Sequence, residues 1–145
     1  MRSHRQTLVG CLIVILLLVA CSGEPKAPLV ASDIVVTASM PGGSMSAGYI
    51  SLRNNTDIEI RISKITSPAF EKIEIHESTL EDGIAKMRRI EALSIPPNSS
   101  VTLENGGKHL MLMRPTTSAE VVSLSFYSDD TVILSVIAPI TPRID

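Results

Sequence analysis

Hydrophobic and polar residues alternate along most of this chain. In residues 58–63 every second residue is an isoleucine and the residues between them are polar. A period of two turns one side of a segment toward a core and the other toward water, which predicts a half-buried β-strand. Similar runs follow along the chain, at residues 34–38, 49–53, 70–76, 84–90, 101–104, 109–113, 121–127 and 131–138.

Turn-forming residues separate these runs. Gly, Pro, Asn and Asp gather between them, at residues 41–43, 54–57, 81–83, 96–98, 105–107 and 129–130, where they favour tight turns. No stretch of the chain carries a convincing helical stripe of hydrophobic residues. Short strands joined by turns, without helices between them, predict an all-β domain, an antiparallel β-sandwich or barrel over residues 33–145.

The N-terminal segment has a different pattern. Arg2 and Arg5 precede thirteen uncharged residues at positions 8–20. A charged start followed by an apolar segment of this length is typical of a secretory signal peptide and is too short for a membrane-spanning helix. We therefore expect residues 1–20 to be a signal peptide that is removed.

The apolar segment ends in Leu18-Val19-Ala20-Cys21, which resembles the bacterial lipobox. By that resemblance Cys21 becomes the lipidated first residue, and residues 21–32 form the lipidated Cys and a polar linker. Attachment through several acyl chains holds a protein on a membrane stably. The expected location is the bacterial periplasm or cell envelope. The alternative is a plain N-terminal membrane anchor with an accidental cysteine.

Composition narrows the function classes. The formal net charge is -2, and removal of Arg2 and Arg5 leaves 11 Lys+Arg against 15 Asp+Glu, or -4. Without a basic cluster, nucleic-acid binding is not expected. No cysteine follows Cys21, so a blue-copper centre, which needs a thiolate, is excluded from the body. We find no catalytic triad, zinc triad or nucleophile elbow, so an enzyme is not expected.

Two histidines remain after residue 20, and each is expected beside a methionine. In residues 73–76 the isoleucines face the core, so His76 points to the opposite face. If residues 80–83 form the turn of a hairpin, His76 lies directly opposite Met87. Directly opposed residues in a sheet have Cβ atoms about 4.5–5.5 Å apart. This geometry predicts one imidazole and one thioether at a shared site.

The same reasoning applies to residues 108–113. Alternation places Leu110 and Leu112 on the core face and His109, Met111 and Met113 on the other. The glycines at 106 and 107 allow the backbone to turn sharply just before them. Thioether sulfur is a soft, uncharged ligand that suits Cu(I), and imidazole also binds copper. Alternatively, each histidine is a surface residue and each methionine fills space in the fold.

The spacing of these residues resembles a known family, the periplasmic copper chaperones of the PCu(A)C type. That family's signature is His, ten residues, Met, twenty-one residues, His, one residue, Met, and it matches His76, Met87, His109 and Met111 without a break. Further similar stretches lie at 40–44, 47–49, 52–54 and 106–112, so the resemblance extends over about residues 34–138.

The resemblance implies a cupredoxin-like β-sandwich that binds one Cu(I) through those four residues and passes it to an acceptor, such as the copper site of cytochrome c oxidase. The sequence departs from the family pattern in two ways. Glu77 follows the first histidine, where the family often has methionine. Many members have a His- and Met-rich C-terminal tail that binds Cu(II), whereas residues 141–145 contain no His or Met, so Cu(II) binding is in doubt. The alternative function is that of a metal-free, membrane-anchored β-sandwich lipoprotein with an adhesion or assembly role.

Overall fold

The computed structural model describes residues 26–40 and 42–142, and every helix or strand in this part of the chain is a β-strand. In chain order the elements are β1 (Leu29–Thr37), β2 (Met45–Asn54), β3 (Ile60–Ile62), β4 (Lys64–Thr66), β5 (Phe70–Glu81), β6 (Ile84–Ile90), β7 (Leu93–Ile95), β8 (Ser100–Leu103), β9 (Lys108–Pro115), β10 (Val121–Ser128) and β11 (Thr131–Thr141). The all-β prediction is confirmed.

The predicted runs all overlap strands, with two differences at the level of elements. The three-residue strands β4 and β7 were not predicted, because no longer alternating run surrounds them, whereas the equally short β3 lies inside the alternating run 58–63. Strand β1 begins at Leu29, and this residue is buried. Residues 29–32, predicted as part of the linker, therefore belong to the folded body.

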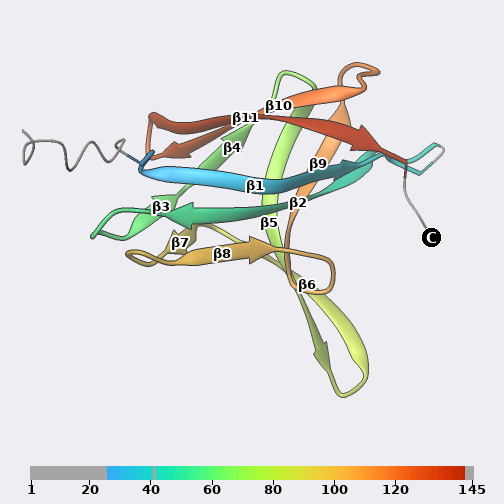
Figure 1. Ribbon diagram of the computed structural model, residues 1–145. Coiled ribbons are helices and arrows are strands. Elements are labelled where there is room, and N and C mark those ends of the chain that lie inside the picture. Colours follow the sequence, from blue (N-terminus) through green and yellow to red (C-terminus); the bar gives the residue numbers. More distant parts are fainter. Residues whose placement is uncertain (1–25, 41, 143–145) are drawn as a thin grey trace, which may run out of the picture.

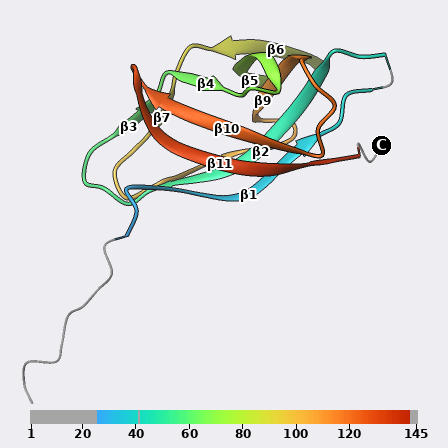
Figure 2. The same cartoon turned by 90° about the horizontal axis from the view of Figure 1, so that it is seen from above.

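One curled sheet forms most of the molecule (Figures 1 and 2). Its strand order is β4-β10-β11-β1-β2-β9-β5-β6, with β8 paired to β2, and β3 and β7 form a separate two-stranded sheet. Neighbouring strands are antiparallel except β1 and β11, which pair in parallel. Strands β4 and β5 also contact each other, so the sheet curls around almost to closure, as in a barrel or sandwich.

The core inside this sheet is mainly aliphatic. Phe70 and Phe126 are its aromatic members, and Ile, Leu, Val and Ala supply the rest. Leu110 and Leu112 of β9 are almost completely buried, as alternation predicts. Since one face of β9 and β5 is fixed against this core, the side chains between the core residues must lie on the opposite face.

The β5–β6 hairpin projects from the rest of the body (Figure 1). Asp82 and Gly83 both have positive φ, at 51° and 78°, which fits a two-residue turn of the kind that matches strand twist. Most of β6 is exposed. Because β6 ends the strand order, this hairpin is attached to the body along one side only.

Candidate functional site

His76 and His109 face each other across two neighbouring strands. The antiparallel register of β5 and β9 pairs His76 directly with His109. Their ring centroids are 6.1 Å apart and the ring planes are inclined by 56°. Each histidine has a buried core residue beside it in the chain, Ile75 before His76 and Leu110 after His109. Because these neighbours fix both strands against the core, two imidazoles from distant parts of the sequence come to one place.

His109 lies on the predicted face but is buried there, with 6% of its surface exposed. Its Nδ1 lies 3.1 Å from the carbonyl oxygen of Gly107. A carbonyl can only accept, so Nδ1 carries the proton and Nε2 keeps its lone pair. The turn at residues 105–107, with positive φ at Gly106, brings that carbonyl to the ring, as the glycines predict.

His76 is held by a carboxylate on its own strand. Its Nε2 lies 3.0 Å from Oε2 of Glu74, whose side chain is 11% exposed. The other oxygen of Glu74 contacts Nζ of Lys72 at 2.7 Å and Nε of Arg89 at 3.3 Å. Two hydrogen bonds, the stronger effect from Lys72 and the weaker from His76, lower the pKa of Glu74 from 4.5 to about 2. Sequence reasoning missed this contact, although alternation puts residues 74 and 76 on one face.

The predicted pairing of His76 with Met87 is wrong by two residues. The turn contains only Asp82 and Gly83, so Met87 pairs with Ser78 and His76 pairs with Arg89. An Asp-Gly pair adopts the two-residue turn because both positions accept positive φ. Ser78 and His76 share a strand face, so Met87 is a diagonal neighbour of His76, still within reach of a long side chain.

Met87, His109 and Met111 line one pocket. It has a volume of about 130 Å³, and its other lining residues are Ala47, Tyr49, Ser78, Asn105 and Gly106. Met111 sits between Ala47 of β2 and Glu74 of β5. His76 is adjacent through its pairing with His109. The fold thus gathers the four residues of the sequence motif at one region of one sheet face.

Two neighbouring residues of interest lie apart from this group. Met113 is two positions beyond Met111, between Met45 and Lys72. Glu77 points to the opposite face of β5, where it pairs with Arg88 at 2.6 Å and Lys108 at 3.0 Å. Hydrogen bonds from Arg88 and then Lys108 lower its pKa. The residue after the first histidine therefore faces away from the pocket.

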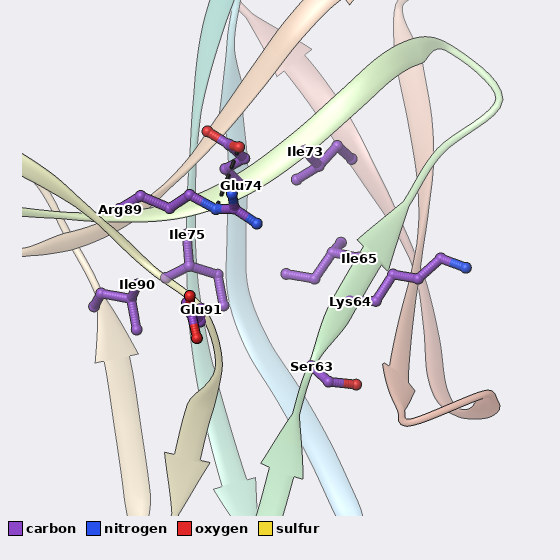
Figure 3. A pocket seen from close by; sticks show the side chains of 9 residues that line it. All are labelled: Ser63, Lys64, Ile65, Ile73, Glu74, Ile75, Arg89, Ile90 and Glu91. Atoms are coloured by element: carbon purple, nitrogen blue, oxygen red, sulfur yellow. Dashed lines mark ion pairs between the residues drawn. The ribbon is translucent and has the colours of Figure 1, made fainter.

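A smaller cavity, of about 40 Å³, lies at the seam where β4 approaches β5. Figure 3 shows its isoleucine side chains and the ion pair between Arg89 and Glu74. None of the four motif residues lines this cavity. Arg89, which lines this cavity, extends from β6 to the carboxylate of Glu74 beside His76.

The donors at this site differ from those of a site rich in carboxylates or thiolates. Within residues 26–40 and 42–142, no group of three or more His, Cys, Asp or Glu side chains could hold a metal ion. The gathered donors are instead two imidazoles and two thioethers.

The part of the chain that the structure describes contains no helix long and apolar enough to cross a membrane. The predicted signal peptide 1–20 and Cys21 lie outside the described residues.

Comparison with protein families and curated proteins gives two matches. The LpqE-like family model, described as "Putative lipoprotein LpqE-like", matches residues 29–139. "Uncharacterized protein RP573" of Rickettsia prowazekii (strain Madrid E) is 29% identical over 91 residues, which are 60% of this chain and 50% of that protein. The chain thus spans about half the length of this curated relative.

Solved structures with the same fold include PCuAC domains. The copper-bound PCuAC domain from PmoF2 has a TM-score of 0.67 and 18% identity, over 80% of this chain and 94% of that one. Cu(I)-DR1885 from Deinococcus radiodurans has a TM-score of 0.62 and 27% identity, over 83% and 81% of the two chains. Its apo form has a TM-score of 0.60 and 26% identity, over 87% of each chain.

The expected resemblance is confirmed by these matches. The family match covers most of the chain, and the PCuAC neighbours share its cupredoxin-like arrangement of strands. The chain therefore belongs to the LpqE-like family and has the fold of the PCuAC domains.

Proposed function

We propose that this protein is an extracytoplasmic copper chaperone that binds one Cu(I) through His76, Met87, His109 and Met111. The observation that carries the proposal is the direct pairing of His76 with His109, with ring centroids 6.1 Å apart. Met87 and Met111 lie at the pocket that His109 lines. Two of the similar solved structures are described as copper-bound and as the Cu(I) form.

The donor set favours Cu(I) over other common metals. Thioether ligands are soft and uncharged, so they suit Cu(I) and are poor ligands for Mg, Ca or Mn. Imidazole nitrogen completes a set that contains no thiolate. Such a site does not depend on a cysteine that would oxidise outside the cytoplasm, although methionine itself can be oxidised to sulfoxide.

Release to an acceptor is compatible with the exposure of the site. Met87 is 53% exposed on the projecting hairpin, so an incoming ligand can reach the metal there first. In the proposed transfer, ligands of the acceptor replace Met and His in turn, and the copper stays Cu(I) throughout. The acceptor implied by the family resemblance is a copper-accepting protein such as cytochrome c oxidase or one of its assembly factors.

The proposed location is the cell envelope. It rests on the signal-peptide pattern of residues 1–20, the lipobox that ends in Cys21, and a family described by the word lipoprotein. A lipid at Cys21 would keep the copper site near a membrane. We propose a carrier rather than an enzyme, because both histidines of the folded body are assigned to the metal.

Anaerobic titration of the full chain in detergent with Cu(I), in competition with a Cu(I) chelator, tests the proposal. We expect one equivalent to bind and the melting temperature to rise with Cu(I). Binding to the native state alone stabilises it by about 2.7 kcal/mol when free ligand is about 100 times Kd. Absence of both effects would leave the metal-free envelope lipoprotein as the better description.

A further inference from the structure

The carboxylate of Glu74 is built into the surroundings of His76. Its Oε2 lies 3.0 Å from Nε2 of the imidazole, and its Oε1 forms ion pairs with Lys72 and Arg89. The two cations come from different strands, β5 and β6. They hold one oxygen of the carboxylate, which leaves the other directed at the imidazole.

This arrangement fixes where the proton of neutral His76 resides. An ionised carboxylate has no proton to give and can only accept hydrogen bonds. Nε2 must therefore be the protonated nitrogen, and Nδ1 must keep its lone pair. A carboxylate partner on one ring nitrogen is the arrangement that commonly orients a metal-binding histidine through the other.

Nδ1 of His76 has no hydrogen-bond partner. Among the described residues it is the one buried side-chain nitrogen or oxygen left without one. A buried polar atom without a partner destabilises the folded state, and native structures seldom contain one. A ligand that accepts the lone pair would remove that cost.

The two histidines are held in opposite ways. In His109 the Nδ1–H donates to the Gly107 carbonyl, and Nε2 is free. In His76 the Nε2–H donates to Glu74, and Nδ1 is free. Each ring has one nitrogen tied to the protein and one available.

We propose that Glu74 is a positioning residue that fixes the tautomer of His76, so that His76 binds copper through Nδ1 while His109 binds through Nε2. This inference rests on the proposed function. Lys72 and Arg89 act through Glu74, because they hold its carboxylate in the orientation that the imidazole requires. An ion pair of purely structural importance would leave the tautomer unchanged when its charge is removed.

The first test uses the metal-free full chain in detergent, labelled with ¹⁵N-histidine, at about pH 8, where imidazole is neutral. Long-range ¹H–¹⁵N correlation spectra distinguish the protonated ring nitrogen from the bare one. We expect His76 to carry its proton on Nε2 alone. In Glu74→Gln, whose amide can donate as well as accept, we expect both tautomers.

Glu77→Gln is the matched control. Glu77 lies on the same strand and is also paired with two cations, but it faces away from the imidazoles. We expect this variant to leave the His76 tautomer as it is. A wild-type His76 protonated on Nδ1, or a Glu74→Gln spectrum identical to wild type, would overturn the proposal. The wild-type measurement does so even if Glu74→Gln fails to fold.

The second test measures Cu(I) affinity by chelator competition in the same three proteins. Loss of a hydrogen-bond partner behind a metal ligand typically costs about 10–100-fold in affinity. We expect a loss in that range for Glu74→Gln and none for Glu77→Gln. If wild type binds Cu(I) and Glu74→Gln binds equally well, the positioning role is wrong. If wild type binds no Cu(I), the proposed function fails, while the tautomer result still stands by itself.

Discussion

The two halves of the proposed copper site differ in how firmly the fold holds them. His109 and Met111 lie on β9, which has strand partners on both sides and Leu110 and Leu112 in the core. Met87 lies on β6, at the end of the strand order and largely exposed. Segments with few buried contacts open locally at low cost. The β9 half, with His109 and Met111, is therefore held rigidly, and we call it the platform. The β6 half, with Met87, lies on the hairpin, which can move aside for ligand exchange.

The largest effect is expected from removing an imidazole. His109→Ala and His76→Ala each delete a proposed ligand. We expect each to weaken Cu(I) binding by more than the roughly 10–100-fold that loss of an outer contact costs. Met113→Ala, on the same face of β9 but outside the proposed ligand set, is the control and should change the affinity little. Chelator competition measures all three, and equal losses would contradict the ligand assignment.

The next effect is on stability and compares the platform with the hairpin. Leu112 is fully buried and Leu80 is 74% exposed. Leu112→Ala should lower the free energy of unfolding by about 2–5 kcal/mol, through lost burial and a cavity. Leu80→Ala should change it by no more than about 0.5 kcal/mol. Urea unfolding of the metal-free chain measures both. A large loss for Leu80→Ala would mean that the hairpin is packed more firmly than its exposure indicates.

A smaller effect is expected from straining the hairpin turn. Gly83 has φ of +78°, and no atom lies within 4 Å of the position that an added methyl group would take. Gly83→Ala therefore adds strain of about 1 kcal/mol without a clash. If the hairpin positions Met87, affinity for Cu(I) should fall by no more than about fivefold. Chelator competition measures this change.

Gly42→Ala is the control for that experiment. Gly42 has a similar φ of +76° and is equally open, but it lies between β1 and β2. We expect it to lower stability comparably and to leave Cu(I) affinity unchanged. An equal loss of affinity in both variants would show that general destabilisation, rather than the hairpin, is responsible.

The smallest effect concerns acid. The pKa of Glu74 is lowered from 4.5 to about 2 in the folded protein, so ionised Glu74 favours the folded state. This contribution is present above about pH 4.5 and is lost as the pH falls toward 2. We expect Glu74→Gln to lose less stability than wild type across that window in metal-free chains. Parallel unfolding curves as a function of pH check this, and identical slopes would contradict it.

The sequence predicts the strands well where burial enforces a period of two, as in β9. It does not predict β4 and β7, because alternation does not extend beyond their three residues, as it does around β3. The parallel pairing of β1 with β11 joins the two ends of the described fold. No local pattern encodes such a long-range pairing, so it could not be predicted from alternation.

The proposed donor set comes from the spacing of the motif, but the local geometry of these four residues could not be predicted completely from the sequence. The position of Met87 depends on the length of one turn, and Asp82-Gly83 favours the shorter turn that the structure has. The contact of Glu74 with His76 depends on side-chain orientation, which alternation restricts to a face but does not fix. The strand pattern thus predicted the face of the site, and the structure supplies its register and hydrogen bonds.

X-ray absorption of the Cu(I)-loaded full chain, prepared anaerobically, detects the atoms bound to the metal. It therefore tests the proposed ligand set directly, without inferring ligands from changes in affinity. We predict one copper with two sulfur neighbours from Met87 and Met111 and two imidazole nitrogens from His76 and His109. A copper ion without sulfur neighbours, or with only one imidazole, would contradict this ligand set.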